Sequence, residues 1–148
     1  MMSKYFGTDG FRGEANVTLT VDHAFRVGRF LGWYYGQEHQ AKIVIGKDTR
    51  RSSYMFECAL AAGITASGAD ACLMHVTTTP SVSYIAKIDE FDCGIMISAS
   101  HNPFHDNGIK LNNPPNGERW SKRSSIESKL TWIVTRSCLM PLGDRLAG

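Results

Sequence analysis

Short apolar runs alternate with longer amphipathic segments between residues 42 and 97, and this alternation restricts the folds that the chain can adopt. The apolar runs are residues 42–46, 71–76 and 93–97. Each has the length of a buried strand, and a repeated strand–helix order favours parallel strands whose connecting helices cover the faces of a sheet. We therefore predict an α/β fold, a three-layer α/β/α domain with a mainly parallel mixed sheet.

Capping and stop residues predict where the helices begin and end. Thr20 suits the N-cap of the first helix, and Ser52 or Ser53 suits that of the second, which Gly68 stops. Small residues on the inner face of the second helix, among them Gly63, predict that this helix lies close to the sheet. The predicted helices cover residues 21–36, about 53–67 and 80–87.

Polar clusters directly follow the three predicted strands. They are residues 46–50, 77–80 and 98–103. Because ligands of open α/β sheets gather at the carboxyl ends of the strands, we expect these clusters to converge on one rim of the sheet. That rim is the predicted site.

Ser100 is the natural nucleophile or phosphate carrier of the third cluster. A serine hydroxyl needs a group that positions it, takes its proton or offsets developing negative charge. His101 is adjacent, and a turn at residues 106–108, whose glycine permits positive φ, is expected to return Lys110 over the loop. These side chains suit phosphoryl transfer, in which positioning and charge neutralisation supply most of the catalysis.

Two arginines, Arg12 and Arg50, lie in other turn-forming segments and are candidates for fixed positive charge near this serine. Simpler interpretations stay open for the individual residues. A Ser-Ala-Ser sequence after a strand is often only a helix N-cap, His101 alone suits a hydrogen-bonded turn, and Lys110 alone suits a solvated charge. The functional interpretation therefore depends on the convergence of the loops.

Composition says little about partners. The formal net charge of +2 gives no reason to expect nucleic acid or an anionic membrane as a partner, and no apolar run is long enough to span a bilayer. The four cysteines are widely spaced and include no Cys-x-x-Cys pair, so we expect reduced thiols and neither a zinc site nor a disulfide framework. We predict a cytoplasmic protein with no nucleic-acid and no membrane partner.

Three separated motifs give the sequence a resemblance to a known family. Residues 7–13 read Gly-Thr-Asp-Gly-Phe-Arg-Gly, residues 46–50 read Gly-Lys-Asp-Thr-Arg, and residues 98–110 begin Ser-Ala-Ser-His-Asn-Pro and end Asn-Gly-Ile-Lys. In this order they resemble the phosphohexomutase superfamily, and the forms of the first and third look most like its bacterial phosphoglucosamine mutase branch. The resemblance covers about residues 4–111, so we interpret residues 1–111 as an N-terminal, phosphoserine-bearing domain.

The resemblance implies a mechanism and residue roles. In the superfamily the serine that matches Ser100 carries a phosphoryl group and donates it to a hexose phosphate, here expected to be a hexosamine phosphate. The bisphosphorylated sugar turns round and returns its other phosphate. The phosphate on Ser100 also supplies one oxygen to magnesium (Mg2+). The implied catalytic residues are Ser100, Lys110 as a proton shuttle, Arg12 and His101, and the implied substrate- or phosphate-binding residues are Asn102, Thr8 and Arg50.

The same resemblance shows what the chain lacks. Superfamily members have four domains, and the Asp-x-Asp-x-Asp metal loop, the sugar-recognition loop and a phosphate clamp lie in the later three. None occurs here, so we interpret the chain as a fragment of an isomerase that interconverts glucosamine 6-phosphate and glucosamine 1-phosphate, inactive alone. A phosphomannomutase or phosphoglucomutase fragment and a non-catalytic dimerisation module stay open, because first domains of this branch resemble homodimer-forming units.

The last part of the chain, residues 112–148, departs from the family pattern. Residues 116–118 begin the expected Asn-Gly-Glu turn, but the sequence then becomes basic and rich in serine. One interpretation is a shifted reading frame, which would give a non-native or disordered tail. The other is a divergent helix, since Ile126, Leu130 and Ile133 keep helical spacing.

Overall fold

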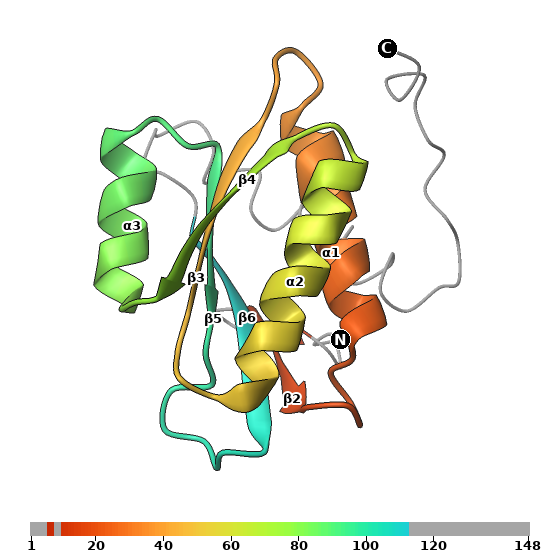
Figure 1. The fold of residues 1–148 in the computed structure, drawn as a ribbon, viewed down its shortest axis with the longest axis vertical. Helices are drawn as coiled ribbons and strands as arrows, with labels where there is room; N and C mark the ends of the chain where they lie inside the picture. Colours follow the sequence, from red (N-terminus) through yellow and green to blue (C-terminus); the bar gives the residue numbers. More distant parts are fainter. Residues whose placement is uncertain (1–5, 8–9, 113–148) are drawn as a thin grey trace.

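A six-stranded mixed sheet with helices on both faces forms the part of the chain that the computed structural model describes, residues 6–7 and 10–112. Helices α1 and α2 cover one face and α3 covers part of the other (Figure 1). The predicted three-layer α/β/α class is confirmed. The elements are β1 (Phe6–Gly7), β2 (Gly10–Glu14), α1 (Val21–Tyr35), β3 (Lys42–Lys47), α2 (Arg51–Ala66), β4 (Asp70–Val76), α3 (Thr79–Ile88), β5 (Cys93–Ile97) and β6 (Asp106–Asn112).

The strand order is β1-β2-β6-β5-β3-β4. Strand β3 pairs in parallel with β4 and β5, as the alternating pattern predicts. The other half is antiparallel: β6 runs against β5 and β2, and β2 runs against β1. The three predicted strands therefore form the parallel half of the sheet, and the antiparallel half comes from segments in which the sequence analysis placed no strand.

The predicted turn at residues 106–108 is wrong. These residues begin β6, and the chain reverses earlier, in the loop of residues 98–105. Gly108 is not one of the two described glycines with positive φ. It is required for space, because a Cβ there would lie 2.8 Å from the carbonyl oxygen of Ser98. The placement of Arg12 in a turn-forming segment is wrong too, since this residue lies within β2.

Helix α1 begins as predicted. The Thr20 hydroxyl accepts a hydrogen bond from the His23 backbone N–H, and the His23 ring accepts one from the Thr20 backbone N–H. This reciprocal pair satisfies two donors that would otherwise be unpaired at the N-terminus. Helix α2 differs from the prediction, because its N-cap is Arg50 and Ser53 instead bonds to Asp48.

Glycines bring α1 and α2 together. A Cβ on Gly63 would lie 2.2 Å from the carbonyl oxygen of Phe25, and one on Gly28 would lie 2.4 Å from that of Leu60. Gly63 therefore permits a close crossing of two helices. The prediction that Gly63 lets α2 approach the sheet is wrong, because the element close to Gly63 is α1.

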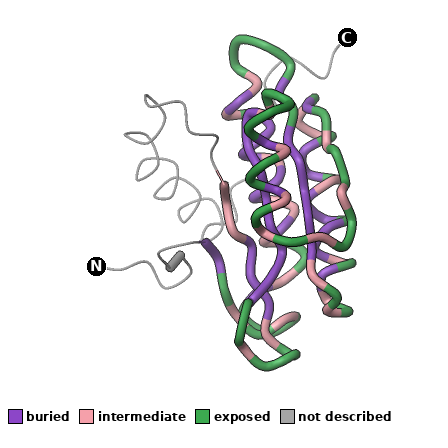
Figure 2. Tube along the Cα trace, turned by 90° about the vertical axis from the view of Figure 1, so that its left-hand side faces the viewer, coloured by how far each residue is buried: buried purple, intermediate pink, exposed green. Residues whose placement is uncertain are grey.

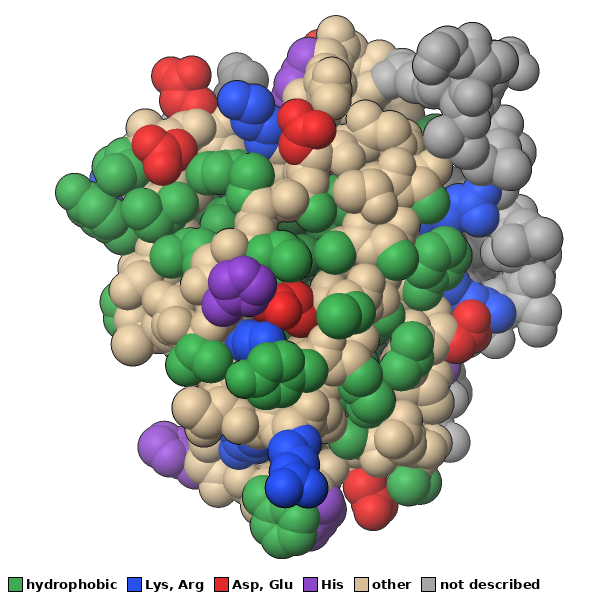
Figure 3. All heavy atoms as spheres, in the orientation of Figure 1, with side chains coloured by type: hydrophobic (Ala, Val, Ile, Leu, Met, Phe, Trp, Pro, Cys, Tyr) green, Lys and Arg blue, Asp and Glu red, His purple; other side chains and the backbone are tan. Residues whose placement is uncertain are grey.

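Two apolar clusters fill the layers on either side of the sheet, and the buried strands lie between more exposed helices (Figure 2). Alternate residues of β5 show the division: Ile95 and Ile97 face α1 and α2, whereas Met96 faces α3 with Val44 and Val82. On the face shown in Figure 3, hydrophobic side chains gather over α3 and β4. Among the described residues, no helix has the length and apolar character needed to cross a membrane.

Candidate functional site

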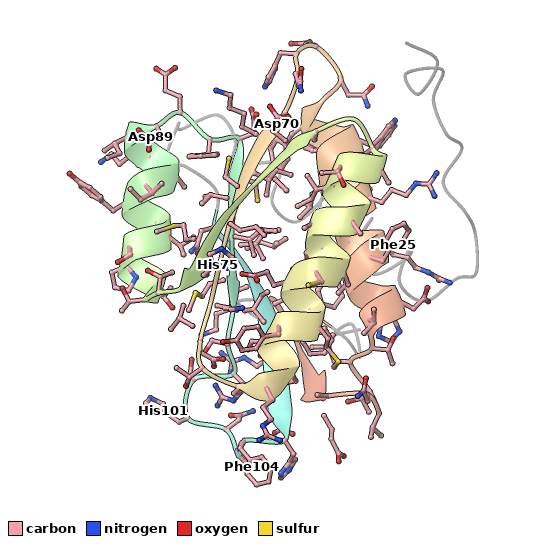
Figure 4. The ribbon with its side chains drawn as sticks, viewed as in Figure 1. Phe25, Asp70, His75, Asp89, His101 and Phe104 are labelled. Carbon is pink, nitrogen blue, oxygen red and sulfur yellow. The ribbon has the colours of Figure 1, made fainter. Side chains whose placement is uncertain are left out.

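The loop of residues 98–105 lies at the end of the sheet where the parallel strands β3 and β5 finish, and its His101 and Phe104 mark this end in Figure 4. The backbone N–H of Asp48, just after β3, donates to the carbonyl oxygen of Ile97 at 3.0 Å. The predicted loops after β3 and β5 therefore meet at this rim. The third predicted loop, residues 77–80, joins the same edge at the end of β3, because the Thr77 backbone N–H donates to the carbonyl oxygen of Lys47 at 2.9 Å. Its Thr78 caps α3, and none of its described hydrogen bonds reaches the Ser100 loop.

Ser100 has an exposed side chain on a strained backbone. Its φ is +54°, in the left-handed region that non-glycine residues seldom occupy. Its backbone N–H donates to Ser98 Oγ at 3.1 Å. Because such a conformation costs on the order of 1–3 kcal/mol and persists only where the surroundings impose it, the strain marks this residue as a functional candidate.

Lys110 contacts the Ser100 hydroxyl directly. Its ammonium donates to Ser100 Oγ at 2.6 Å. The contact arises because β6 returns antiparallel beside β5, and because Lys110 lies on the opposite face of β6 from the buried Ile109. A cation at this distance favours negative charge on the serine oxygen or on a phosphate bound to it.

Arg12 lies on the same face of the sheet. It is opposite Gly108 in the β2–β6 pair, and its Cγ would be 3.1 Å from a Cβ at that glycine. Directly opposed residues of an antiparallel pair share a face, and so do residues 108 and 110 along β6. The exposed guanidinium of Arg12 and the ammonium of Lys110 therefore belong to the surface that Ser100 adjoins.

Arg50 contacts the backbone of the loop. Its Nη2 donates to the carbonyl oxygens of Ser100, at 3.2 Å, and Asn102, at 3.0 Å. Its Nη1 donates to Asp48. This arginine was predicted to bind phosphate, whereas its described contacts are to protein oxygens.

Asp48 is held ionised beside Arg50. Burial alone would raise the pKa of this carboxyl, but hydrogen bonds from Ser53, from the backbone and side chain of Arg50 and from Ser98 outweigh burial, so the pKa lies below its ordinary value. Asp48 lies in the second motif, but no role was predicted for it from the sequence. Its position two residues before Arg50 could have indicated that the carboxylate pairs with this arginine.

The remaining predicted residues lie around the loop. His101 is exposed, and no described hydrogen bond involves its ring. Asn102 donates its backbone N–H to the carbonyl oxygen of Ala99 at 3.1 Å, and its side chain lies 3.4 Å from Asp106. Thr8 lies outside the described residues, as does the predicted tail beyond residue 112.

Asn107 was missed by the sequence analysis, which placed it in a turn. It is buried, and its side-chain amide donates to Ser52 Oγ at 2.8 Å and Ser53 Oγ at 3.0 Å. The start of β6 is thereby joined to the start of α2. No sequence signal separates this asparagine from an ordinary turn residue.

The described residues do not form a metal centre by themselves. They contain no group of three or more His, Cys, Asp or Glu side chains placed to hold an ion. Ser100 Oγ is hydrogen-bonded to the ammonium of Lys110. An ammonium has no lone pair and cannot be a metal ligand. A metal at this rim would need a phosphate on Ser100 and ligands from beyond the described residues.

The fold and the rim define a class of protein. Residues 3–134 match the family described as phosphoglucomutase/phosphomannomutase, alpha/beta/alpha domain I, and the chain belongs to this family. It corresponds to an N-terminal phosphohexomutase domain. A Burkholderia thailandensis protein of the same family has the same fold, with a TM-score of 0.73 at 24% identity over 91% of this chain and 30% of its own.

The named relatives belong to one branch of the family. The phosphoglucosamine mutase of Lachnospira eligens is 81% identical over 115 residues, which are 76% of this chain and 26% of the relative. That of Lachnoclostridium phytofermentans is 76% identical over 112 residues, 76% of this chain and 25% of the relative. The chain thus spans about a quarter of the length of these relatives.

Proposed function

We propose that this chain is the phosphoserine-bearing domain of a phosphoglucosamine mutase, a cytoplasmic isomerase that interconverts glucosamine 6-phosphate and glucosamine 1-phosphate. The single observation that carries the proposal is the 2.6 Å contact between Lys110 and the hydroxyl of Ser100, a residue held at positive φ. The high identity to phosphoglucosamine mutases supports the choice of an amino sugar.

Ser100 Oγ is the proposed carrier of the phosphoryl group. When the phosphoryl group leaves for a sugar hydroxyl, a bond from phosphorus to the sugar oxygen forms and the bond from phosphorus to Oγ breaks. Lys110 gives a proton to Oγ, and the hydroxyl proton of the sugar passes to solvent. When a phosphoryl group returns, Lys110 takes the proton from Oγ as Oγ bonds to phosphorus, and the sugar oxygen that leaves phosphorus takes a proton from solvent. A positioned acid or base of this kind contributes on the order of 10²–10⁴-fold to a rate.

Arg12 has the proposed role of neutralising charge on the transferring phosphate from the neighbouring strand. His101 and Asn102 shape the loop and contact the sugar phosphate in the proposal, and Thr8 adds a phosphate contact. A bound Mg2+ would neutralise further charge, with one oxygen supplied by the phosphate on Ser100. The chain's own residues hold and protonate the serine oxygen.

A chimaera tests the proposal. In the Lachnospira eligens mutase, the matching 115-residue segment is replaced by that of this chain, since 81% identity makes the new joints compatible. We expect the purified chimaera to convert glucosamine 6-phosphate, and its intact mass to show one phosphate that phosphatase removes. Ser100→Ala should abolish both. A folded chimaera that keeps its activity after Ser100→Ala, or that converts only mannose or glucose phosphates, contradicts the proposal.

A non-catalytic dimerisation module is a second candidate, and one observation favours it. Strand β4 is an edge of the sheet, and Leu73 and Val76 on it are 40% and 50% exposed. Edge strands with exposed apolar side chains readily pair with another chain. Sedimentation of the chain should then show a dimer that Leu73→Lys dissociates, and a monomer at all concentrations would exclude this role for β4.

A further inference from the structure

The Arg50 guanidinium hydrogen-bonds to the backbone of the Ser100 loop on both sides of His101. One nitrogen, Nη2, donates to the carbonyl oxygen of Ser100 at 3.2 Å and to that of Asn102 at 3.0 Å. These two carbonyl groups belong to the peptides that begin and end the tip of the loop. Holding both with one rigid planar group fixes the orientation of the peptide that follows Ser100.

Ser100 is held from the other directions by different groups. The Ser98 hydroxyl accepts its backbone N–H, which fixes the preceding peptide, and Lys110 donates to its side chain. Arg50 therefore controls ψ of Ser100 while Ser98 controls φ. A strained backbone of this kind persists only when several contacts impose it together.

Arg50 is poorly placed to receive a phosphate. Only 15% of its side chain is exposed, and its Nε is buried with no hydrogen-bond partner among the described residues. Its charge is offset by the carboxylate of Asp48, which accepts from both its backbone N–H and its Nη1. Ser53 Oγ in turn donates to Asp48 at 2.6 Å, so the guanidinium rests on a carboxylate fixed to the first turn of α2.

We infer that Arg50 is a positioning residue, which holds Ser100 in its left-handed conformation so that the hydroxyl points at Lys110, and that it does not bind the substrate's phosphate. This inference rests on the proposed function, in which the Ser100 hydroxyl carries the phosphoryl group. The loop geometry itself can be measured without any turnover.

Nuclear magnetic resonance of the full 148-residue chain tests the inference with Arg50→Lys, which keeps the charge but loses the planar fork. We expect the Ser100 Cα shift to leave its left-handed value and amide hydrogen exchange at Ser100 and Asn102 to rise about tenfold. Arg51→Lys is the matched control, because Arg51 is exposed and its side chain makes no described hydrogen bond. It should leave all three signals unchanged.

A more severe variant adds a rescue. Arg50→Ala should release the loop in the same way, and millimolar guanidinium should restore the Ser100 Cα shift, which a general loss of stability would not allow. If Arg50→Ala does not fold, Arg50→Lys alone decides. An unchanged Ser100 shift and unchanged exchange in Arg50→Lys overturn the inference.

Kinetics in the chimaera separate the two possible roles of Arg50. A positioning role predicts that Arg50→Lys lowers kcat at least tenfold with KM within about twofold, because the misplaced hydroxyl affects the transition state alone. A raised KM with unchanged kcat would show phosphate binding and overturn the inference. If the chimaera has no activity while Arg50→Lys still releases the loop, the proposed function fails and the positioning of the loop stands.

Discussion

Backbone strain at a single residue, Ser100, marks the candidate site. The described non-glycine residues with positive φ are Asn16, His75, Glu90 and Ser100. Of these, only Ser100 lies at the rim where the loops after β3 and β5 meet. The neighbours of this serine in the sequence were enough to select it, but they did not reveal the strain. The backbone conformation of Ser100 depends on contacts with Ser98, Arg50 and Lys110 that form only in the folded domain.

The backbone of Ser100 gives a stability prediction. Ser100→Gly and Ser100→Ala both remove the hydroxyl, but only alanine keeps the penalty of a Cβ at positive φ. We expect the glycine variant to have the larger free energy of unfolding, by about 1 kcal/mol. Urea unfolding of both variants measures the difference.

The matched control for this pair is Ser83, exposed within α3. There the order should reverse, with Ser83→Ala more stable than Ser83→Gly by about 1 kcal/mol, since alanine favours the helix. If the alanine variant were the more stable one at both positions, a left-handed backbone at Ser100 would be contradicted.

A buried ion pair lies beside the rim and gives a second residue-scale prediction. Lys47 Nζ is 3.0 Å from Glu57 Oε1 and 3.2 Å from the centre of the Tyr54 ring, and the two charged side chains are 1% and 5% exposed. In the described part of the chain, Lys47→Met would leave the buried Glu57 carboxyl with only the exposed His75 ring, 3.6 Å from Oε1, beside it. We expect urea unfolding to show a loss of about 3–5 kcal/mol.

The double variant Lys47→Met/Glu57→Leu should recover most of that loss, because it removes both buried charges. Asp22→Asn, which breaks an exposed pair with Arg26, should cost less than about 1 kcal/mol. A small loss in Lys47→Met would show that Glu57 is stabilised by another partner, either His75 or water.

Secondary-structure elements were predictable where local pattern and tertiary role agree. The strands β3, β4 and β5 are apolar and the three helices carry caps or stop residues, so their positions followed from the sequence. Strands β2 and β6 are rich in glycine and polar residues, and their register with each other and with β5 stabilises them. That register is a property of the folded sheet, so a local pattern did not reveal it.

The N-terminus of α1 gives an element-scale prediction, because its cap depends on pH. Burial lowers the pKa of His23, Asp22 raises it and Arg26 lowers it again, with a net value below the ordinary one of about 6.5. The unfolded chain then binds more protons than the folded one as the pH falls below about 6.5, so stability should fall there. Protonation also removes the acceptor that His23 Nδ1 offers to the Thr20 backbone N–H.

His23→Gln replaces this acceptor with one that does not titrate. Compared with the wild type, we expect its free energy of unfolding to depend less on pH between about 6.5 and 5. Thr20→Ala is the matched control, and it should lose about 1 kcal/mol at every pH while keeping the wild-type slope. Equal slopes in His23→Gln and the wild type would mean that His23 does not carry the effect.

At the scale of the whole molecule, no described helix covers the site on the side of β2 and β6. Helix α3 packs against β3 and β5, whereas Arg12 and Lys110 lie on the same face of the sheet farther along, over β2 and β6. The relatives are about four times as long as the segment they share with this chain. We propose that the missing part of the site, including what recognises the sugar, comes from that additional length.

This openness predicts that the chain alone has no measurable turnover. Fixing a sugar phosphate against a nucleophile supplies about 7–11 kcal/mol of a barrier in a complete site, and a serine with one lysine at an open rim supplies little of it. With glucosamine 6-phosphate, magnesium and a sugar bisphosphate primer, we expect the chain to be at least about 10⁵-fold slower than the chimaera. The chain carrying Ser100→Ala sets the background. Turnover within about 100-fold of the chimaera that Ser100→Ala abolishes would show that this domain is a complete enzyme.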